Sequence, residues 1–254
     1  MSYDTVKAHL NLNALLRNLE NLYTLDQETA SLIQSWDMAV RFTVLGGLSA
    51  RLGFQNGTCT YQSPVQDPAD VVLCFLSGRH LNAMFEERSN PIPLKGFKHL
   101  GFLKNEFPKV TKRLEYFLKP TPALLEDEAY VRVNTALSLY IAVYSVCELL
   151  RVDPVGRQIG PQMPAGTLQL SVLPDGPHAY IRYDGRGGAT AGIGVAETPS
   201  AVLTFESCQT ANALFNGKLD GFGAIALGNI KMRGLIPLVE NTNVIFDRIP
   251  VYLQ

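Results

Sequence analysis

Hydrophobic side chains near the start of the chain recur at helical spacing. Leucines separated by three or four residues run from Leu12 to Leu22 and form one apolar stripe. This spacing predicts helix over residues 4–34. Asp26, followed by Glu28 and Thr29, is expected to cap a second, shorter helix within this segment.

The pattern changes at Met38, where apolar and polar residues begin to alternate. The alternation is broken at Gly46-Gly47 and Asn56-Gly57, which are turn signals, so residues 38–62 are expected to form short strands. A further strand is predicted at residues 70–77 and helices at 78–88 and 105–118. Two prolines at 120 and 122 end this part of the chain.

A strongly apolar stretch follows, from Val133 to Leu150. Four polar residues interrupt it and arginines flank it. A membrane-spanning helix needs about 20 predominantly apolar residues, so we instead expect a helical connector whose central helix is buried between two domains. The Gly- and Pro-rich run 154–166 is predicted to be a linker.

The second half of the chain repeats the first. Strands are predicted at residues 167–173, 178–183, 190–197 and 200–207. A helix is predicted at 209–217, a hairpin or strand pair at 223–234, and a closing helix at 235–249.

Direct alignment supports a duplication. Residues 70–85 align without a gap on residues 200–215, and seven of the sixteen positions are identical. Upstream, residues 42–45 align with 170–173; downstream, Gly96 is matched with Gly228 and Gly101 with Gly234. The alternative is two unrelated strand–helix units with similar propensities, but shared propensity does not place Asn-Ala-x-Phe in register.

The predicted fold class is therefore α/β, of the α+β kind, with two tandem domains. Each is expected to be a mostly antiparallel sheet covered by helices. The predicted divisions are an N-terminal helical segment (1–36), a first and more diverged domain (37–119), a helical connector and linker (120–165), and a second domain (166–254).

The overall charge is balanced. Lys and Arg number 22 and Asp and Glu 23, for a formal net charge of -1. This balance argues against a nucleic-acid binder and against a polybasic membrane-surface module, although a local basic patch stays open. Four widely spaced cysteines are expected to be buried thiols, and the N-terminus lacks the pattern of a secretory signal, so we expect a cytoplasmic protein.

Motifs for catalysis or metal binding are absent from the sequence. The four histidines lie outside metal-ligand spacings, and the glycine-rich run 185–194 has neither GxGxxG nor GK[ST]. We therefore expect no catalytic residue, no metal, no cofactor and no enzyme activity. An enzyme acting on a lipid-like substrate stays open as a weaker alternative, because catalytic triads need not be local in sequence.

Residues 213–234, ALFNGKLDGFGAIALGNIKMRG, resemble the sterol carrier protein 2 family. The resemblance covers roughly residues 166–250 and more faintly 38–118. The matching positions are a pattern of glycines, lysines and apolar residues: Ala213, Leu214, Gly217, Lys218, Leu219, Ala224, Gly228, Ile230, Lys231 and Gly234. In the first copy, Glu87-Arg88 replaces Gly217-Lys218, so its pocket is expected to be altered or lost.

The resemblance implies a five-stranded sheet covered by helices around an apolar tunnel for fatty acids, sterols or acyl-CoA. The residues it implies for the apolar pocket are Leu214, Phe215, Phe222, Ala224, Leu235, Ile236, Val239 and Phe246. Lys218 and Lys231 are expected at the rim, where they would meet an anionic head group. Core packing alone is the alternative explanation of the apolar positions, and a solvated rim that of the lysines.

The leading hypothesis is thus an intracellular lipid-binding or lipid-carrier protein with a hydrophobic small molecule as its partner. The alternative is a non-catalytic scaffold of the same fold with filled pockets, which docks an enzyme or forms a homodimer. Both exclude nucleic acid and a transmembrane segment.

Overall fold

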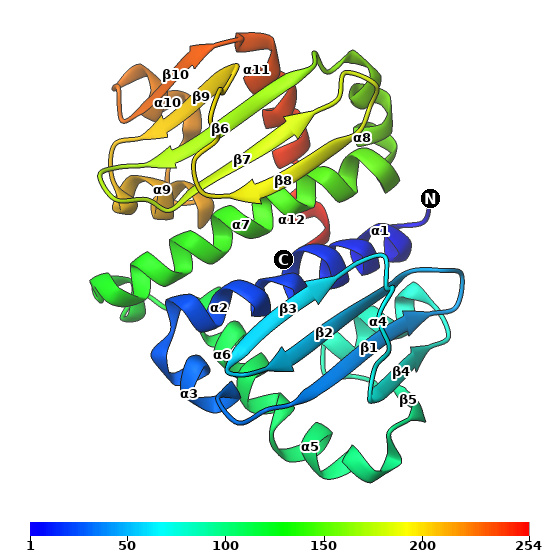
Figure 1. Ribbon diagram of the computed structural model, residues 1–254. Coiled ribbons are helices and arrows are strands. Elements are labelled where there is room, and N and C mark those ends of the chain that lie inside the picture. The colour runs from blue at the N-terminus through cyan, green and yellow to red at the C-terminus, as the bar shows by residue number, and fades with distance from the viewer. Residues whose placement is uncertain (254) are drawn as a thin grey trace. The chain divides into compact units, whose positions relative to one another are not determined.

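The computed structural model describes residues 1–253, with Phe222 described by its backbone alone. The chain divides into two compact units, Met1–Lys119 and 120–254. Each unit contains one five-stranded sheet with its helices (Figure 1).

Unit 1 begins with a nearly continuous helical segment. Its parts are α1 (Tyr3–Leu10), a π-helical turn η1 (Asn11–Leu15), a 3₁₀ turn η2 (Leu16–Asn18), α2 (Leu19–Leu25) and α3 (Gln27–Ile33). The predicted helix over residues 4–34 is confirmed, and Asp26 caps α3 as expected by accepting a hydrogen bond from the Thr29 N–H.

The sheet of unit 1 is mixed. Its strands are β1 (Met38–Val44), β2 (Ser49–Gln55), β3 (Thr58–Gln62), β4 (Val71–Phe75) and β5 (Ile92–Lys95), in the order β3-β2-β1-β4-β5. β1 and β4 are parallel and the other three pairs are antiparallel. The remaining helices are α4 (Gly78–Phe85), η3 (Phe97–His99), α5 (Leu100–Asn105) and α6 (Phe107–Leu118).

Alternation along these strands produces an aromatic core on one face of the sheet. Phe42, Phe54 and Phe75 are fully buried, and Phe107 of α6 packs against two of them at ring-centroid distances of 6.2 and 6.3 Å. Aromatic side chains of this size dominate the energetics of a core. The helix α6 is therefore held to the sheet by tilted and edge-to-face ring contacts.

Unit 2 has a similar order of elements, with one additional short helix, α10, before its last strand. It contains η4 (Leu124–Glu126), α7 (Glu128–Val152), α8 (Pro154–Ile159), η5 (Gly160–Gln162), β6 (Gly166–Val172), β7 (His178–Tyr183), β8 (Ala189–Ile193), β9 (Ala201–Phe205), α9 (Cys208–Phe215), α10 (Gly221–Ala226), β10 (Ile230–Gly234), α11 (Ile236–Phe246) and α12 (Ile249–Tyr252). The strand order is β10-β9-β6-β7-β8, with β6 and β9 parallel. Read from β3 in unit 1 and from β8 in unit 2, the two sheets have the same strand order. The predicted α+β class, with two mostly antiparallel sheets covered by helices, is confirmed.

Two predicted elements of unit 2 are wrong. Residues 154–159 form helix α8 rather than a linker, because Pro154 stands at the first helical position, where its missing N–H is tolerated. Residues 221–226 form helix α10 rather than one arm of a hairpin, because the Asp220 side chain accepts a hydrogen bond from the Gly223 N–H and caps the turn. Strand β5 was not predicted, since its Pro93 is acceptable only in an edge strand.

Helix α7 is long and apolar enough to cross a membrane by length and composition. However, 83% of its most apolar 18-residue stretch is buried inside the protein. Within unit 2, α7 contacts β7, β8, α9 and α11. These contacts are typical of a core helix that supports a sheet.

The four cysteines are free thiols. Cys59 and Cys74 are buried, as predicted, whereas Cys147 and Cys208 are half-buried. Burial raises the pKa of the Cys59 thiol above its usual range, which makes this thiol poorly reactive.

A capping aspartate ties the beginning of each unit to its end. Asp26 caps α3 and pairs with Arg113 of α6, with 2.7 Å between Arg113 Nη2 and Asp26 Oδ1. Asp153 caps α8 by accepting hydrogen bonds from the Val155 and Gly156 N–H groups. It also pairs with Arg248, which follows α11, at 3.3 Å.

The capping carboxylates are held ionised by their partners. Burial by itself raises the pKa of Asp153, but hydrogen bonds from the Tyr252 hydroxyl, the Gly156 N–H and Arg248 outweigh it, so the net pKa is lowered. The same competition lowers the pKa of Asp26. Because the pKa is lower in the folded state, each carboxylate stabilises the fold above its ordinary pKa of 3.8 and loses this effect as the pH falls through the folded-state value.

Replacing Asp153 with Ala is expected to lower the free energy of unfolding by about 2–3 kcal/mol at neutral pH. The variant loses the cap of α8 and leaves Arg248 without its buried partner. The measurement is urea unfolding followed by circular dichroism, at neutral pH and at about pH 3.

The matched control is Asp247→Ala, which removes an exposed carboxylate beside Arg248. It is expected to change the free energy of unfolding by less than about 0.5 kcal/mol. Equal effects of the two variants, or a difference that persists unchanged at low pH, would contradict the assigned role of Asp153.

Candidate functional site

The inner face of the unit 2 sheet is covered by two helices. α7 contacts β7 and β8, while α11 contacts β6, β9 and β10. The Tyr183 hydroxyl of β7 and Thr242 Oγ1 of α11 lie 2.7 Å apart in a buried hydrogen bond. Burial raises the pKa of Tyr183, so this hydroxyl stays protonated and joins sheet and helix.

Buried amides join α9 to α7. Asn212 Nδ2 donates to Asn134 Oδ1 at 2.7 Å and to Thr135 Oγ1 at 2.9 Å, and Asn216 Nδ2 also donates to Asn134 Oδ1. In unit 1 the equivalent Asn82 of α4 donates to the Asp4 carbonyl of α1 at 3.0 Å. Buried polar groups need such partners. Asparagine stands at both of these equivalent positions because, in each unit, its side chain joins the helix after the fourth strand to an earlier helix. The sequence alignment alone does not indicate this role.

The predicted pocket residues differ in their exposure. Ala224 and Val239 are fully buried. Leu214 and Phe215 at the end of α9, and Phe246 at the end of α11, are half-buried. These five residues thus range from the packed interior to its edge.

Two further predicted pocket residues, Leu235 and Ile236, lie at the start of α11. Leu235 is 37% exposed and Ile236 is 36% exposed, so both present apolar surface to solvent. The side chain of Phe222 lies outside the described part of the chain. The cavity-lining role of these residues stays a prediction.

Both predicted rim lysines are exposed. Lys218 follows the left-handed Gly217 that ends α9, and its N–H donates to the Ala213 carbonyl. Lys231 lies in the edge strand β10 opposite Thr204. Arg233 is two residues further and therefore projects from the same face of β10 as Lys231. Exposed cations on short segments can meet an anionic group without a large desolvation cost.

A glycine forms the corner between β10 and α11. Gly234 has a φ of +89°, and a Cβ placed there would lie 2.2 Å from the Ser200 carbonyl oxygen. Gly96 has the same φ, and its Cβ would lie 2.7 Å from the Asp70 carbonyl oxygen. Since residues 70 and 200 are equivalent in the repeat, Gly96 corresponds to Gly234. The predicted pairs Gly96 with Gly228 and Gly101 with Gly234 are therefore wrong.

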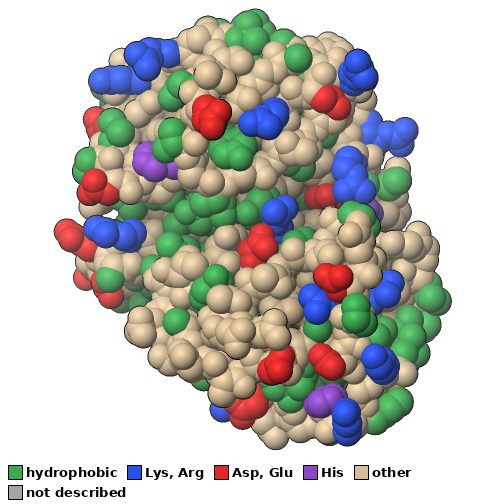
Figure 2. Space-filling model, in the orientation of Figure 1, with side chains coloured by type: hydrophobic (Ala, Val, Ile, Leu, Met, Phe, Trp, Pro, Cys, Tyr) green, Lys and Arg blue, Asp and Glu red, His purple; other side chains and the backbone are tan. Residues whose placement is uncertain are grey.

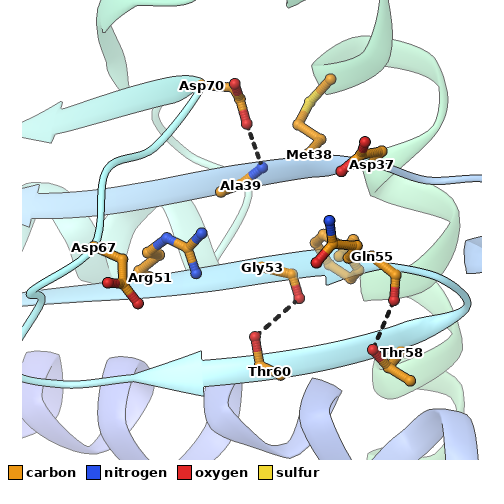
Figure 3. A pocket seen from close by; sticks show the side chains of 11 residues that line it. Asp37, Met38, Ala39, Arg51, Gly53, Gln55, Thr58, Thr60, Asp67 and Asp70 are labelled. Atoms are coloured by element: carbon orange, nitrogen blue, oxygen red, sulfur yellow. Dashed lines mark hydrogen bonds between the residues drawn. The ribbon is translucent and has the colours of Figure 1, made fainter.

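A different hollow lies in unit 1, on the face of β1, β2 and β3 away from the aromatic core (Figure 3). Its volume is about 320 Å³. Asp70 Oδ2 accepts a hydrogen bond from the Ala39 N–H at 2.8 Å, and Arg51 Nε donates to the Pro68 carbonyl at 2.8 Å. The lining residues are mostly polar: Asp37, Met38, Ala39, Arg51, Gly53, Phe54, Gln55, Thr58, Thr60, Asp67 and Asp70.

The chemistry of this hollow suits a small polar solute rather than a lipid. Three carboxylates and one guanidinium line it, and Arg51 extends alongside Asp67 (Figure 3). Its residues carry no recognisable motif in the sequence, and only the pairing of β1, β2 and β3 and the loop before β4 brings them together. Within the described residues, no group of three His, Cys, Asp or Glu side chains is arranged to hold a metal ion.

Parts of the chain are similar to solved structures of sterol carrier proteins. The sterol carrier protein domain 2 of Helicoverpa armigera is 18% identical over 46% of this chain and 91% of that chain, with a TM-score of 0.35. Palmitated SCP2L2 from Aedes aegypti is 18% identical over 38% of this chain and 92% of that chain, with a TM-score of 0.28. Sterol carrier protein 2 from Yarrowia lipolytica in its apo form is 16% identical over 40% and 91%, with a TM-score of 0.30.

Each of these likenesses covers less than half of the chain and concerns the fold alone. No protein-family model and no curated protein matches the chain.

Replacing Gly234 with Ala is expected to lower the free energy of unfolding by about 3 kcal/mol or more. The new Cβ would collide with the Ser200 backbone in addition to the strain of a left-handed conformation. The matched control is Gly228→Ala, which shares the left-handed φ but has open space around its Cβ. It should cost about 1 kcal/mol, and equal losses measured by thermal unfolding would contradict the collision.

Proposed function

We propose that unit 2 is a non-catalytic lipid-binding module of a cytoplasmic carrier. It would hold a fatty acid, a sterol-like molecule or an acyl-CoA ester among α9, α10 and α11, without a cofactor. This fold is associated with lipid binding. The identity of the ligand and the presence of a tunnel belong to our proposal.

One observation carries the proposal. The segment that resembles the sterol carrier family presents partly exposed apolar side chains, Leu235 and Ile236 among them, in a unit that also exposes Lys218 and Lys231. An acyl chain with a carboxylate needs this combination of apolar surface and cationic groups.

Burial of the ligand's apolar surface supplies the driving force. Micromolar affinity corresponds to about 8 kcal/mol. At about 25 cal/mol per Å², this requires the removal of at least roughly 330 Å² of apolar surface from water. Because such a force has no direction, the module should accept ligands of different head groups and lengths.

A second candidate function is a scaffold of the same fold that docks an enzyme or a second copy of the chain. The full burial of Ala224 and Val239 favours it, since no water-sized space reaches either residue. A filled interior would leave partner binding to the exposed surface.

Native mass spectrometry of the purified full chain separates the two candidates. A co-purifying fatty acid, sterol-like or acyl-CoA species would support the carrier. A ligand-free mass, together with no uptake of a fluorescent fatty acid during titration, would support the scaffold.

The Ile236→Ser variant is expected to bind a fluorescent fatty acid about tenfold more weakly than the wild type. It removes an apolar group of the size whose burial contributes roughly 1.5–3 kcal/mol. Its matched control is Val244→Ser in the same helix, because Val244 is 44% exposed and lies outside the predicted pocket. Equal affinities of the two variants would argue against a pocket at the start of α11.

Replacing both Lys218 and Lys231 with Ala is expected to weaken binding of palmitate several-fold and to leave binding of its methyl ester unchanged. Removal of the two cations affects only a ligand that carries a negative charge. The measurement is competition with a fluorescent fatty acid at low ionic strength. Unchanged palmitate affinity would show that the lysines form a solvated rim.

A further inference from the structure

We propose that residues 92–112 of unit 1, called here the basic–apolar segment, dock onto an anionic lipid bilayer. The segment comprises β5, η3, α5 and the first half of α6. This inference goes beyond the ligand pocket proposed for unit 2 and is independent of it.

Large apolar side chains in this segment are exposed to solvent. Four of them fall within nine consecutive residues: Ile92, Leu94, Phe97 and Leu100. Phe97 is 62% exposed. Isolated exposed apolar residues are ordinary, but a contiguous group marks an interaction surface.

The apolar side chains lie in two neighbouring elements of the segment. Ile92 and Leu94 belong to the edge strand β5, and both are exposed. Phe97 and Leu100 are three residues apart in successive helical turns, and Lys104 follows Leu100 by four residues, so all three lie on one side. All side chains of η3 and α5 are exposed or half-buried.

Phe102 anchors this helical part to the rest of unit 1. Its ring packs against Trp36 with 4.8 Å between centroids and an interplanar angle of 78°. The fold thus fixes α5 through Phe102 while it leaves Phe97 and Leu100 outside the core.

The charge of the segment is strongly positive although that of the chain is not. Residues 92–112 contain five lysines and a single carboxylate, Glu106, whereas the whole chain has a net charge of -1. Glu106 is paired with Lys109 at 2.9 Å, and Lys95 Nζ donates to the Ala69 carbonyl. Lys98, Lys104 and Lys112 are exposed, and within the described part of the chain none of them has an ion-pair partner.

Exposed apolar groups interspersed with unpaired lysines fit an anionic membrane surface. The apolar side chains enter the interface and the lysines remain at the level of the lipid phosphates. Figure 2 shows hydrophobic and basic side chains next to one another at the lower right, over β5. An acidic protein partner is the other class of occupant that this charge would suit, and absence of binding to anionic vesicles in the test below would leave it as the alternative.

The test is sedimentation of the ligand-free 254-residue chain with phosphatidylcholine vesicles that contain or lack phosphatidylserine. We expect binding to the anionic vesicles, with little binding to the neutral ones. Raising the salt from about 0.1 M to about 0.5 M should weaken it, because screening shortens the range of the lysine charges. No lipid ligand is added, so failure here leaves the carrier proposal untouched.

Two variants separate the apolar and electrostatic contributions. Phe97→Ser/Leu100→Ser should weaken partitioning at least about tenfold through lost apolar insertion. Lys98→Gln/Lys104→Gln/Lys112→Gln should also weaken it at least about tenfold, since each lysine near an anionic surface is worth about fivefold. Both variants alter exposed side chains, and circular dichroism verifies that they fold.

Matched controls change an equal number of exposed apolar or cationic side chains in unit 2. Val195→Ser/Leu227→Ser removes two apolar side chains that are even more exposed, and Arg132→Gln/Arg157→Gln/Arg186→Gln removes three exposed cations. Both controls should bind vesicles like the wild type. The proposal is overturned if the wild type does not bind anionic vesicles, or if the segment variants bind them no more weakly than the controls.

Discussion

A buried aspartate connects the first helices of each unit with its last. Asp26 and Asp153 each follow a long helical segment, cap the next short helix, and pair with an arginine of the C-terminal helical region. The sheet lies between these two helical regions in the sequence. The ion pair can therefore form only when the strands have placed both ends correctly. Because desolvation opposes ionisation of the carboxylate, its hydrogen bonds must together outweigh that cost, and in both units they lower its pKa.

Much of the fold could be predicted from local patterns. The helical stripe of residues 4–34, the glycine turns between the first strands and the 130-residue repeat all appear in the structure. These features depend on periodicity and turn chemistry, which a single sequence displays directly. The cap at Asp26 was also recognisable, because the residues after it are typical of a first helical turn.

Features that depend on distant partners could not be predicted. The pairing of the Asp153 carboxylate with Arg248 and Tyr252 is one such feature, because these residues lie 95 and 99 positions further along the chain. The equivalence of Gly96 and Gly234 requires knowledge of which carbonyl faces each glycine. The polar hollow of unit 1 and the exposure of Leu235 and Ile236 likewise follow from tertiary packing. The net charge of the whole chain gives no sign of the basic–apolar segment, since acidic residues elsewhere balance its lysines.

The parallel pair at the centre of each sheet sets an order of assembly. β1 forms hairpin contacts with β2 shortly after it in sequence, but its other edge waits for β4, and β6 similarly waits for β9. Pairing β1 with β4, or β6 with β9, closes a long loop, and the entropy lost in doing so opposes this step until the strands are in contact. We therefore expect the three-stranded meander to form before the sheet is complete. Unit 1 contains both Asp26 and Arg113, so its closing ion pair needs no residue beyond Lys119. During synthesis the first unit can therefore complete its fold while the second is still being made.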